Sequence, residues 1–344
     1  MKTTKNNFFL KSMESPSPPF HFQPLNGLQH ILQTRRYKAW LLDQFGVLHD
    51  GKQPYPGAIS ALNKLASNGA KMVIISNSSR RASTTIEKMK TLGFDPSLFV
   101  GAITSGELTH QYLQRREDDW FATLGRSCIH MTWSDRGAIS LEGLGLHVVE
   151  RVEHAEFVLA HGTEALGQSS GATCPTSLEH LEQILERCAA KRIPMVVANP
   201  DFVTVEAREL RVMPACYSSA LINFLLLFPD HHFLCYWQGT LAAKYEKLGG
   251  EVKWMGKPGE MIYKSAMAMT GIDASDTIAV GDSLFHDIKG ANAAGIQSAF
   301  ITGGIHATEL GVGGVGDRAD LSAVKFLASK YDAIPSYVLP AFTW

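Results

Sequence analysis

Short apolar runs alternate with amphipathic stretches in the first third of the chain. Two continuous apolar runs, each ending on a polar residue, are typical of strands buried in a parallel sheet: 38–43 and 71–76. The other elements predicted here are a helix with apolar residues at 58, 61, 62, 65 and 66 that ends at Asn68-Gly69, a helix with Ala82, Ile86 and Met89 on one face, and a strand at 100–104.

The same alternation returns in the rest of the chain. The further predicted elements are strands at 128–132, 158–161, 194–198, 277–281 and 297–302, and helices at 176–190 and 287–294. Repeated strand–helix–strand units specify an α/β fold with right-handed crossovers. We therefore predict a doubly wound parallel-sheet core formed by residues 28–106 and 254–344, with a second α/β domain inserted at 107–253.

Composition narrows the possible functions. The 33 acidic and 32 basic residues give a net charge of −1, which argues against a nucleic-acid binder because phosphate contacts need clustered Lys and Arg. Hydrophobic residues make up 45% of the chain, enough for a packed core, yet no run approaches the length of a membrane span. The 5 cysteines are widely spaced without a CxxC motif, which favours a reducing compartment.

The first 27 residues are rich in proline and contain one acidic residue, Glu14. They lack the apolar core of a secretory signal, and we predict a disordered tail. The same composition also suits an organelle transit segment. We therefore expect a soluble intracellular protein in the cytoplasm, or in a plastid or mitochondrion if the tail is a transit peptide.

Four chemically active side chains follow predicted strands: Asp43, Ser76, Lys257 and Asp282. Ligands of open parallel sheets bind at the carboxyl ends of the strands. Each residue alone has an ordinary explanation, such as a helix cap, a turn or a surface lysine. Their order along the chain, carboxylate, hydroxyl, lysine and carboxylate, makes a chance pattern less plausible.

Five stretches carry a resemblance to a known family: 43–51 (Asp-Gln-Phe-Gly-Val-Leu-His-Asp-Gly), 74–77 (Ile-Ile-Ser-Asn), 198–201 (Ala-Asn-Pro-Asp), 256–258 (Gly-Lys-Pro) and 281–291 (Gly-Asp-Ser-Leu-Phe-His-Asp-Ile-Lys-Gly-Ala). From residue 38 onward the chain resembles the haloacid dehalogenase (HAD) superfamily, and within it the NagD-like class IIA subgroup. The resemblance implies a Rossmann-like core, an α/β cap at 107–253, a Mg²⁺ cofactor and a small phosphorylated substrate. A homodimer formed through the cap is compatible with it.

The resemblance also implies residue roles. Asp43 would be the nucleophile that forms an aspartyl-phosphate, and Mg²⁺ would bind Asp43, Asp282 and the backbone carbonyl of Phe45. Ser76 and the N–H of Asn77 would bind the phosphate, and Lys257 would neutralise charge between Asp43 and the phosphate. The remaining expected roles are substrate contacts from the cap by Asn199 and Asp201, and orientation of Lys257 by Asp287, which has a helix cap as an equally good explanation.

One position departs from the family pattern. Related phosphatases carry a general acid two residues after the nucleophile, and this chain has Phe45 there. Positioned proton transfer contributes about 10²–10⁴-fold to a rate, so we expect a slow phosphatase, a substrate with a good leaving group, or a substitute donor. His49 and Asp50, in the turn expected to flank the site, are the nearest candidate substitutes, although an ordinary turn histidine explains His49 better. The alternative function is a catalytically weak protein that uses the phosphate pocket for binding or as a scaffold.

Residues 215–238 do not fit the pattern of the second domain. They contain two cysteines, two adjacent histidines and a strongly apolar stretch at 220–228. Cys216, His231, His232 and Cys235 do not match a common zinc spacing. Without this segment, 212–214 would join 239–244 in the continuous stretch typical of the subgroup, so we predict an atypical insertion.

Overall fold

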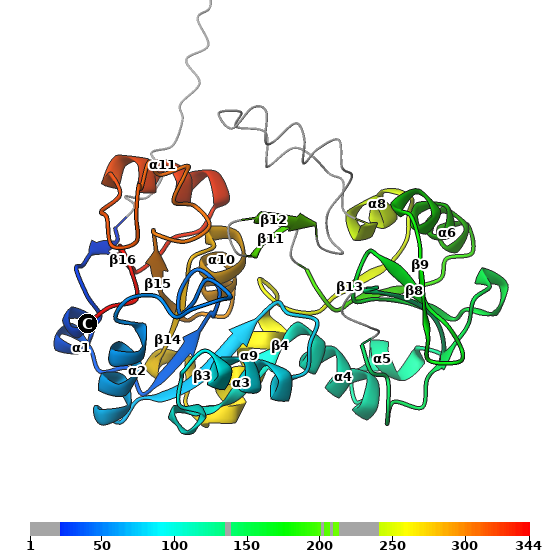
Figure 1. The fold of residues 1–344 in the computed structure, drawn as a ribbon, viewed down its shortest axis with the longest axis horizontal. Helices are drawn as coiled ribbons and strands as arrows, with labels where there is room; N and C mark the ends of the chain where they lie inside the picture. Colours follow the sequence, from blue (N-terminus) through cyan, green and yellow to red (C-terminus); the bar gives the residue numbers. More distant parts are fainter. Residues whose placement is uncertain (1–20, 135–138, 201–202, 207–208, 213–240) are drawn as a thin grey trace, which may run out of the picture.

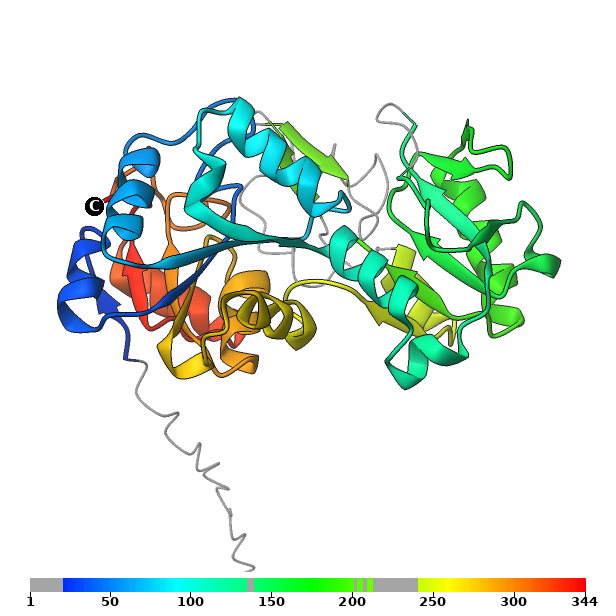
Figure 2. The same cartoon turned by 90° about the horizontal axis from the view of Figure 1, so that it is seen from below.

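The structure is a computed structural model that describes residues 21–134, 139–200, 203–206, 209–212 and 241–344. Two lobes lie side by side along the long axis of the molecule, and each is built around its own β-sheet (Figures 1 and 2). The hairpin β11 (Val203–Glu206) and β12 (Glu209–Val212) lies between the two lobes in Figure 1.

The sheet of the first lobe has the order β1-β16-β15-β14-β2-β3-β4, and all of its pairings are parallel. Its strands are β1 (Gln23–Pro24), β2 (Ala39–Leu42), β3 (Lys71–Ser76), β4 (Phe99–Thr104), β14 (Thr277–Gly281), β15 (Gln297–Ile301) and β16 (Tyr337–Leu339). The helical segments of this lobe are α1 (Gln29–Thr34), α2 (Ala58–Ser67), α3 (Ala82–Thr91), η1 (Pro96–Leu98), α9 (Glu260–Thr270), η3 (Ala274–Asp276), the π-helical turn η4 (Leu284–Ile288), α10 (Lys289–Ala293) and α11 (Leu321–Tyr331).

Helices cover both faces of this sheet because its strands are apolar on both sides. Trp40 and Leu42 of β2 belong to the same core cluster as Leu62 of α2. Leu41, which points to the opposite face, shares a different cluster with Tyr263 of α9. The fully buried, continuously apolar strand is therefore what the sequence pattern predicted for a doubly wound sheet.

The second lobe combines parallel and antiparallel strands. Its sheet has the order β13-β10-β7-β5-β8-β9, and β6 also pairs with β5. β8 runs antiparallel to both of its neighbours, β5 and β9. Its strands are β5 (Ser127–Thr132), β6 (His147–Val148), β7 (Phe157–Ala160), β8 (Ala165–Gly167), β9 (Thr173–Pro175), β10 (Met195–Val197) and β13 (Val252–Trp254). Its helical segments are α4 (Ser105–Arg115), α5 (Asp119–Thr123), η2 (Val152–His154), α6 (Leu178–Ala190) and α8 (Leu241–Lys247).

These two lobes confirm the predicted α/β fold with a parallel-sheet core. The last strand of the second sheet, β13, extends to Trp254, one residue beyond the predicted end of the inserted domain at Lys253. The prediction of a tail up to residue 27 is wrong for its last part. Gln23 and Pro24 form β1, which pairs with β16, and Pro24 is tolerated there because β1 is the edge strand of the sheet.

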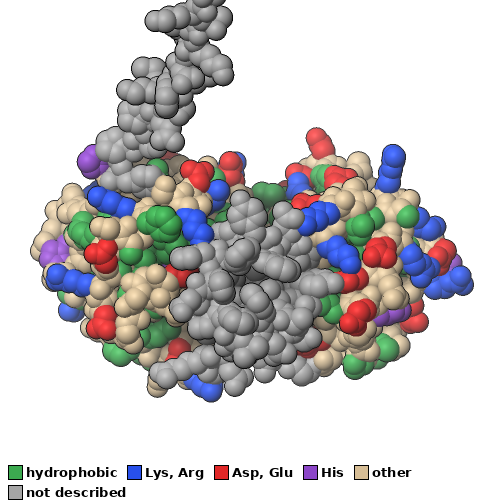
Figure 3. All heavy atoms as spheres, turned by 90° about the horizontal axis from the view of Figure 1, so that it is seen from above, with side chains coloured by type: hydrophobic (Ala, Val, Ile, Leu, Met, Phe, Trp, Pro, Cys, Tyr) green, Lys and Arg blue, Asp and Glu red, His purple; other side chains and the backbone are tan. Residues whose placement is uncertain are grey.

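Some predictions fall outside the described residues. These are the first 20 residues of the expected tail, Asp201 and the segment 215–238. No helix among the described residues is long and apolar enough to cross a membrane. On the face shown in Figure 3, described Lys and Arg side chains intermingle with Asp and Glu on both lobes, consistent with the near-zero net charge.

Candidate active site

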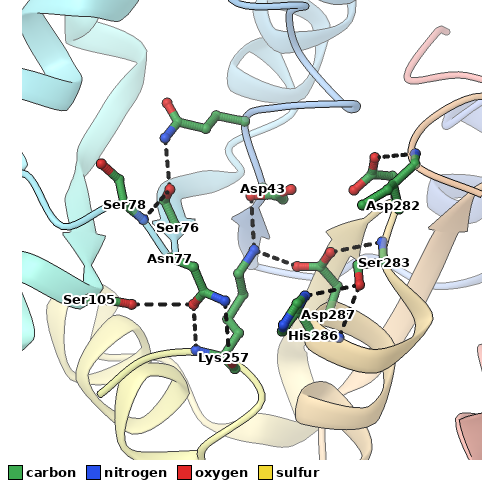
Figure 4. A network of polar contacts seen from close by, with 12 residues as sticks. Asp43, Ser76, Asn77, Ser78, Ser105, Lys257, Asp282, Ser283, His286 and Asp287 are labelled. Carbon is green, nitrogen blue, oxygen red and sulfur yellow. Dashed lines mark hydrogen bonds and ion pairs between the residues drawn. The ribbon is translucent and has the colours of Figure 1, made fainter. Parts of the chain in front are cut away.

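The ammonium group of Lys257 lies between two carboxylates (Figure 4). Its Nζ atom is 2.9 Å from Asp43 Oδ1 and 2.7 Å from Asp287 Oδ1. The three side chains are only 4, 11 and 3% exposed, respectively. Asp43 follows β2, Lys257 follows β13 and Asp287 belongs to η4, so the fold brings together three distant segments. Each buried charge in this trio therefore has an oppositely charged partner, which offsets the cost of its burial.

A third carboxylate completes the cluster. β14 pairs in parallel with β2, so Asp282 emerges beside Asp43. Oxygens of Asp43, Asp282 and Asp287 all lie within 4.8 Å of one another. When the three carboxylates and Lys257 are ionised, two negative charges remain uncompensated in a buried site, which is costly without a cation. An all-oxygen donor set of this size suits Mg²⁺, so the residues present fit the expected metal.

The electrostatics of the cluster follow from burial and from these charges. Burial raises the pKa of Asp43 to about 7, although Lys257 opposes the shift. Burial, with the charges of Asp43 and Asp287, also raises the pKa of Asp282 well above its ordinary value. Burial alone would lower the pKa of Lys257, but Asp287 and Asp43 outweigh it and hold that pKa well above its usual range. Lys257 is therefore a permanent cation.

Ser76 is the last residue of β3 and lies on the other side of Asp43. Its Oγ accepts hydrogen bonds from Gln44 Nε2 at 2.7 Å and from the N–H of Ser78 at 3.2 Å. Both contacts use the oxygen as an acceptor, which leaves the hydroxyl proton free to donate to an anion.

The side chain of Asn77 ties the Ser76 loop to Lys257. Its Oδ1 accepts from the backbone N–H of Lys257 at 2.7 Å, and its Nδ2 donates to the carbonyl of the same residue at 3.1 Å. Ser105 Oγ also donates to Asn77 Oδ1 at 3.3 Å. Gly256 lies so close that an added Cβ would be 2.0 Å from Ser105 Oγ and 2.9 Å from Pro200 Cγ. Ser105 lies where the chain passes from the first lobe to the second, and Gly256 and Lys257 lie where it returns. Both connections therefore contact Asn77, in the loop that follows Ser76.

Comparisons with known proteins agree with this arrangement. The family model "Haloacid dehalogenase-like hydrolase" matches residues 40–147, and a second, HAD-hydrolase-like model matches residues 254–324. Together they cover more than half of the chain and include Asp43, Ser76, Lys257 and Asp282. The chain belongs to the haloacid dehalogenase-like hydrolase family.

Individual relatives of this HAD chain add detail. It is 30% identical over 115 residues to the ribonucleotide monophosphatase NagD of Escherichia coli (strain K12), a match that covers 31% of the chain and 46% of NagD. The chain thus spans about half the length of the curated relative it matches.

Two solved structures extend the similarity over nearly the whole chain. A hydrolase of the haloacid dehalogenase-like family from Brucella suis 1330 superimposes with a TM-score of 0.65 at 25% identity, covering 92% of this chain and 99% of the other. A p-nitrophenyl phosphatase from Archaeoglobus fulgidus has a TM-score of 0.59 at 19% identity, with coverages of 90% and 97%, and shares the fold.

The HAD chain keeps Phe45 two residues after Asp43. A β-bridge joins Phe45 and His49. In it the N–H of His49 donates to the carbonyl of Gln44, and the N–H of Gly46 donates to the carbonyl of His49. The carbonyl of Phe45 takes no part in these two bonds. Gly46 has a φ of +75°, and an added Cβ there would be 1.8 Å from Asp282 Oδ2. The turn after the nucleophile is therefore pressed against the carboxylate of Asp282.

His49 is fully buried within this turn. Its ring centre lies 4.7 Å from that of Phe45 and 6.4 Å from that of Phe94, and its Nδ1 accepts from the N–H of Gly51 at 3.0 Å. Burial, helped by the charge of Lys88, lowers the pKa of His49 to about 4. A neutral, enclosed imidazole is a poor proton donor, so the structure favours the ordinary turn histidine over the substitute acid.

The cap of this HAD chain reaches the site through the carboxyl ends of its strands. Asn199 follows β10 and is fully buried, one residue before the Pro200 that packs against Gly256. Trp133 follows β5 and its Nε1 donates to Ser79 Oγ at 3.3 Å.

Several residues that shape this site are not among those predicted from the sequence. They are Gln44, which holds Ser76, the amide side chain of Asn77, Ser105, and the N–H of Ile305, which donates to Asp282 Oδ2 at 2.7 Å. Gln44 alone had a usable signal, because it is adjacent to the nucleophile.

Proposed function

We propose that this chain is a Mg²⁺-dependent phosphatase that cleaves a small phosphomonoester through an aspartyl-phosphate on Asp43. The observation that carries the proposal is the buried cluster in which Lys257 contacts Asp43 and Asp287 while Asp282 lies within 4.8 Å. A structural protein has no need for three buried carboxylates, two after strands and one in η4, because such a cluster costs stability. Membership of a hydrolase family supports the same reaction class.

The first step transfers the phosphoryl group to the protein. A carboxylate oxygen of Asp43 attacks phosphorus, the P–O bond to the leaving group breaks, and the leaving oxygen departs with the electron pair. Lys257, held by Asp287, neutralises the charge that Asp43 and the phosphate bring together. The Ser76 hydroxyl donates to a phosphate oxygen, and the N–H of Asn77 is the second candidate donor.

The second step restores the carboxylate. Water attacks phosphorus, the acyl-phosphate bond breaks, and inorganic phosphate leaves Asp43. Asp43, Asp282 and the Phe45 carbonyl would hold Mg²⁺, which supplies positive charge to the phosphoryl oxygens when bound. Access of water depends on how the cap covers the site.

Phe45 determines which substrates suit this site. A phenyl ring cannot protonate the leaving oxygen, and the buried His49 with its low pKa does not replace that function. An alkoxide leaving group needs a proton, whereas a phenolate needs little protonation. We therefore infer that substrates with acidic leaving groups, such as aryl phosphates or acyl phosphates, are turned over best. The similarity in fold to a p-nitrophenyl phosphatase is compatible with this preference.

The test is hydrolysis of an aryl phosphate by the full chain with Mg²⁺ and with excess chelator. Turnover should require Mg²⁺ and vanish in Asp43→Asn, while Asp276→Asn, on the exposed Lys38 ion pair, serves as the matched control with normal activity. Phe45 favours one alternative, a binding or scaffold protein that uses the same pocket. Absence of turnover together with tight binding of phosphate would support that alternative and refute the phosphatase.

A further inference from the structure

Two short segments beside the carboxylate cluster hold each other through reciprocal hydrogen bonds. The N–H of Ile305 donates to Asp282 Oδ2 at 2.7 Å. Leu284 lies two residues after Asp282, and its N–H donates to His306 Nε2 at 3.3 Å. We refer to these two bonds as the clasp. In each bond a side chain of one segment accepts a hydrogen bond from the backbone N–H of the other.

The loop that carries His306 is shaped to approach Asp282 closely. An added Cβ on Gly304 would be 2.1 Å from Asp282 Oδ2 and 2.3 Å from its Cβ, so only glycine allows the contact. The Ile305 bond occupies Oδ2 and leaves Oδ1 of Asp282 for another partner. The Ile305 bond therefore holds the carboxylate of Asp282 in one orientation.

The side chain of His306 is buried and contacts a carboxylate and two aromatic rings. Its side chain is 7% exposed, and its Nδ1 is 2.6 Å from Glu309 Oε2. Its ring centre lies 5.2 Å from that of Tyr331 and 6.0 Å from that of Phe300. Because Nε2 accepts a hydrogen bond from Leu284, the proton of a neutral ring lies on Nδ1, and the Nδ1–H group donates to Glu309. Glu309 thereby fixes both the tautomer and the orientation that the clasp needs.

We propose that His306 is a positioning residue that sets the affinity of the site for Mg²⁺ by fixing Asp282 through the clasp. This inference rests on the proposed function, since it takes Asp282 as a metal ligand. Removing the direct hydrogen-bond partner of a metal ligand commonly weakens metal binding about 10–100-fold. His306 acts one step further out, because it holds the loop that carries the Ile305 N–H. A role in packing alone would change stability and leave the Mg²⁺ affinity of the folded protein unchanged.

The experiment measures Mg²⁺ binding directly by titration calorimetry on the metal-free full chain, beside aryl phosphate turnover. His306→Ala should weaken Mg²⁺ binding about 10-fold, the lower end of that range, because His306 acts on Asp282 through the loop. His306→Gln should recover most of the affinity, because its Oε1 can accept from Leu284. Leu310→Ala is the matched control: Leu310 shares the core cluster of Leu284 but takes no part in the clasp. It should bind Mg²⁺ as tightly as the wild type.

The possible outcomes distinguish the role of His306 in Mg²⁺ binding from the proposed phosphatase activity. Equal Mg²⁺ affinity in wild type and folded His306→Ala overturns the inference and leaves the phosphatase standing. Equal weakening in Leu310→Ala also overturns it, because packing would then explain the effect. A wild type that binds Mg²⁺ without turnover refutes the phosphatase, and the affinity comparison still decides the role of His306. Should His306→Ala not fold, Glu309→Ala replaces it, and an unchanged affinity in that variant overturns the inference.

Discussion

Replacing Lys257 by methionine tests whether the buried ammonium holds the carboxylate cluster together. Methionine has a similar length and fills most of the same space, so it leaves only a small cavity. The substitution removes the charge that lies 2.9 Å from Asp43 and 2.7 Å from Asp287. Both carboxylates then remain buried and face each other without their shared cation.

The size of the effect follows from burial. Removing one partner of a buried ion pair costs about 3–5 kcal/mol, because the remaining charge stays desolvated. An exposed pair shows the contrast. Lys264 and Glu260 are 66 and 49% exposed at i,i+4 spacing, and such pairs contribute about 0.3–0.5 kcal/mol. We expect Lys257→Met to lose roughly ten times as much free energy of unfolding as Lys264→Met.

The assay is urea unfolding of both variants and the wild type in chelator at neutral pH. A further variant, Lys257→Met with Asp287→Asn, removes one stranded charge and should recover about 1–3 kcal/mol of the loss. A Lys257→Met protein within about 0.5 kcal/mol of Lys264→Met would refute the reasoning. A loss that Asp287→Asn does not reduce would show that the charge is not its cause.

Two more predictions follow from the geometry. In the cap, His130 and His161 share a 3.0 Å hydrogen bond, and burial lowers the pKa of His130 to about 4 and that of His161 well below its ordinary value. The unfolded chain therefore takes up protons that the folded chain excludes. This stability is complete above pH about 6.5 and falls as the pH drops toward 4, by up to about 1.4 kcal/mol per pH unit for each histidine. Melting temperatures at neutral pH and at pH near 5 measure the loss, and it should shrink in His130→Asn with His161→Asn but not in the exposed His147→Gln. Phe45→Asp should speed alkyl phosphate turnover by at most about 10²–10⁴-fold and aryl phosphate turnover much less, whereas His49→Ala should leave their ratio unchanged. Equal, efficient hydrolysis of both substrate types by the wild type would contradict the missing proton donor.

Several elements could be predicted because local pattern alone specifies them. The run 71–76 became β3 with the same bounds, since continuous apolar residues leave only a buried strand as a good solution. Strand ends also located the cluster, because parallel strands bring their carboxyl ends to one edge. Because ligands of open α/β sheets bind at this edge, the sequence alone predicts that Asp43, Ser76 and Asp282 belong to one site.

Other features depend on contacts that no local pattern records. The Asn77 side chain holds the backbone of Lys257 across 180 residues, and Ile305 reaches Asp282 across 23. β1 was missed because Pro24 suggested a tail, whereas its strand exists only through pairing with β16. The burial of His49 depends on Phe94, which comes from a different turn of the chain. Such features follow from tertiary packing and require the structure.

Transfer of the phosphoryl group to Asp43 can be detected by mass spectrometry of acid-quenched reactions. The full chain is mixed with Mg²⁺ and an aryl phosphate, quenched in acid during turnover and digested. The account predicts one added phosphoryl group on the peptide that contains Asp43, absent with chelator and absent in Asp43→Asn. Steady turnover without that modification, or with the phosphoryl group on another residue, would contradict the account.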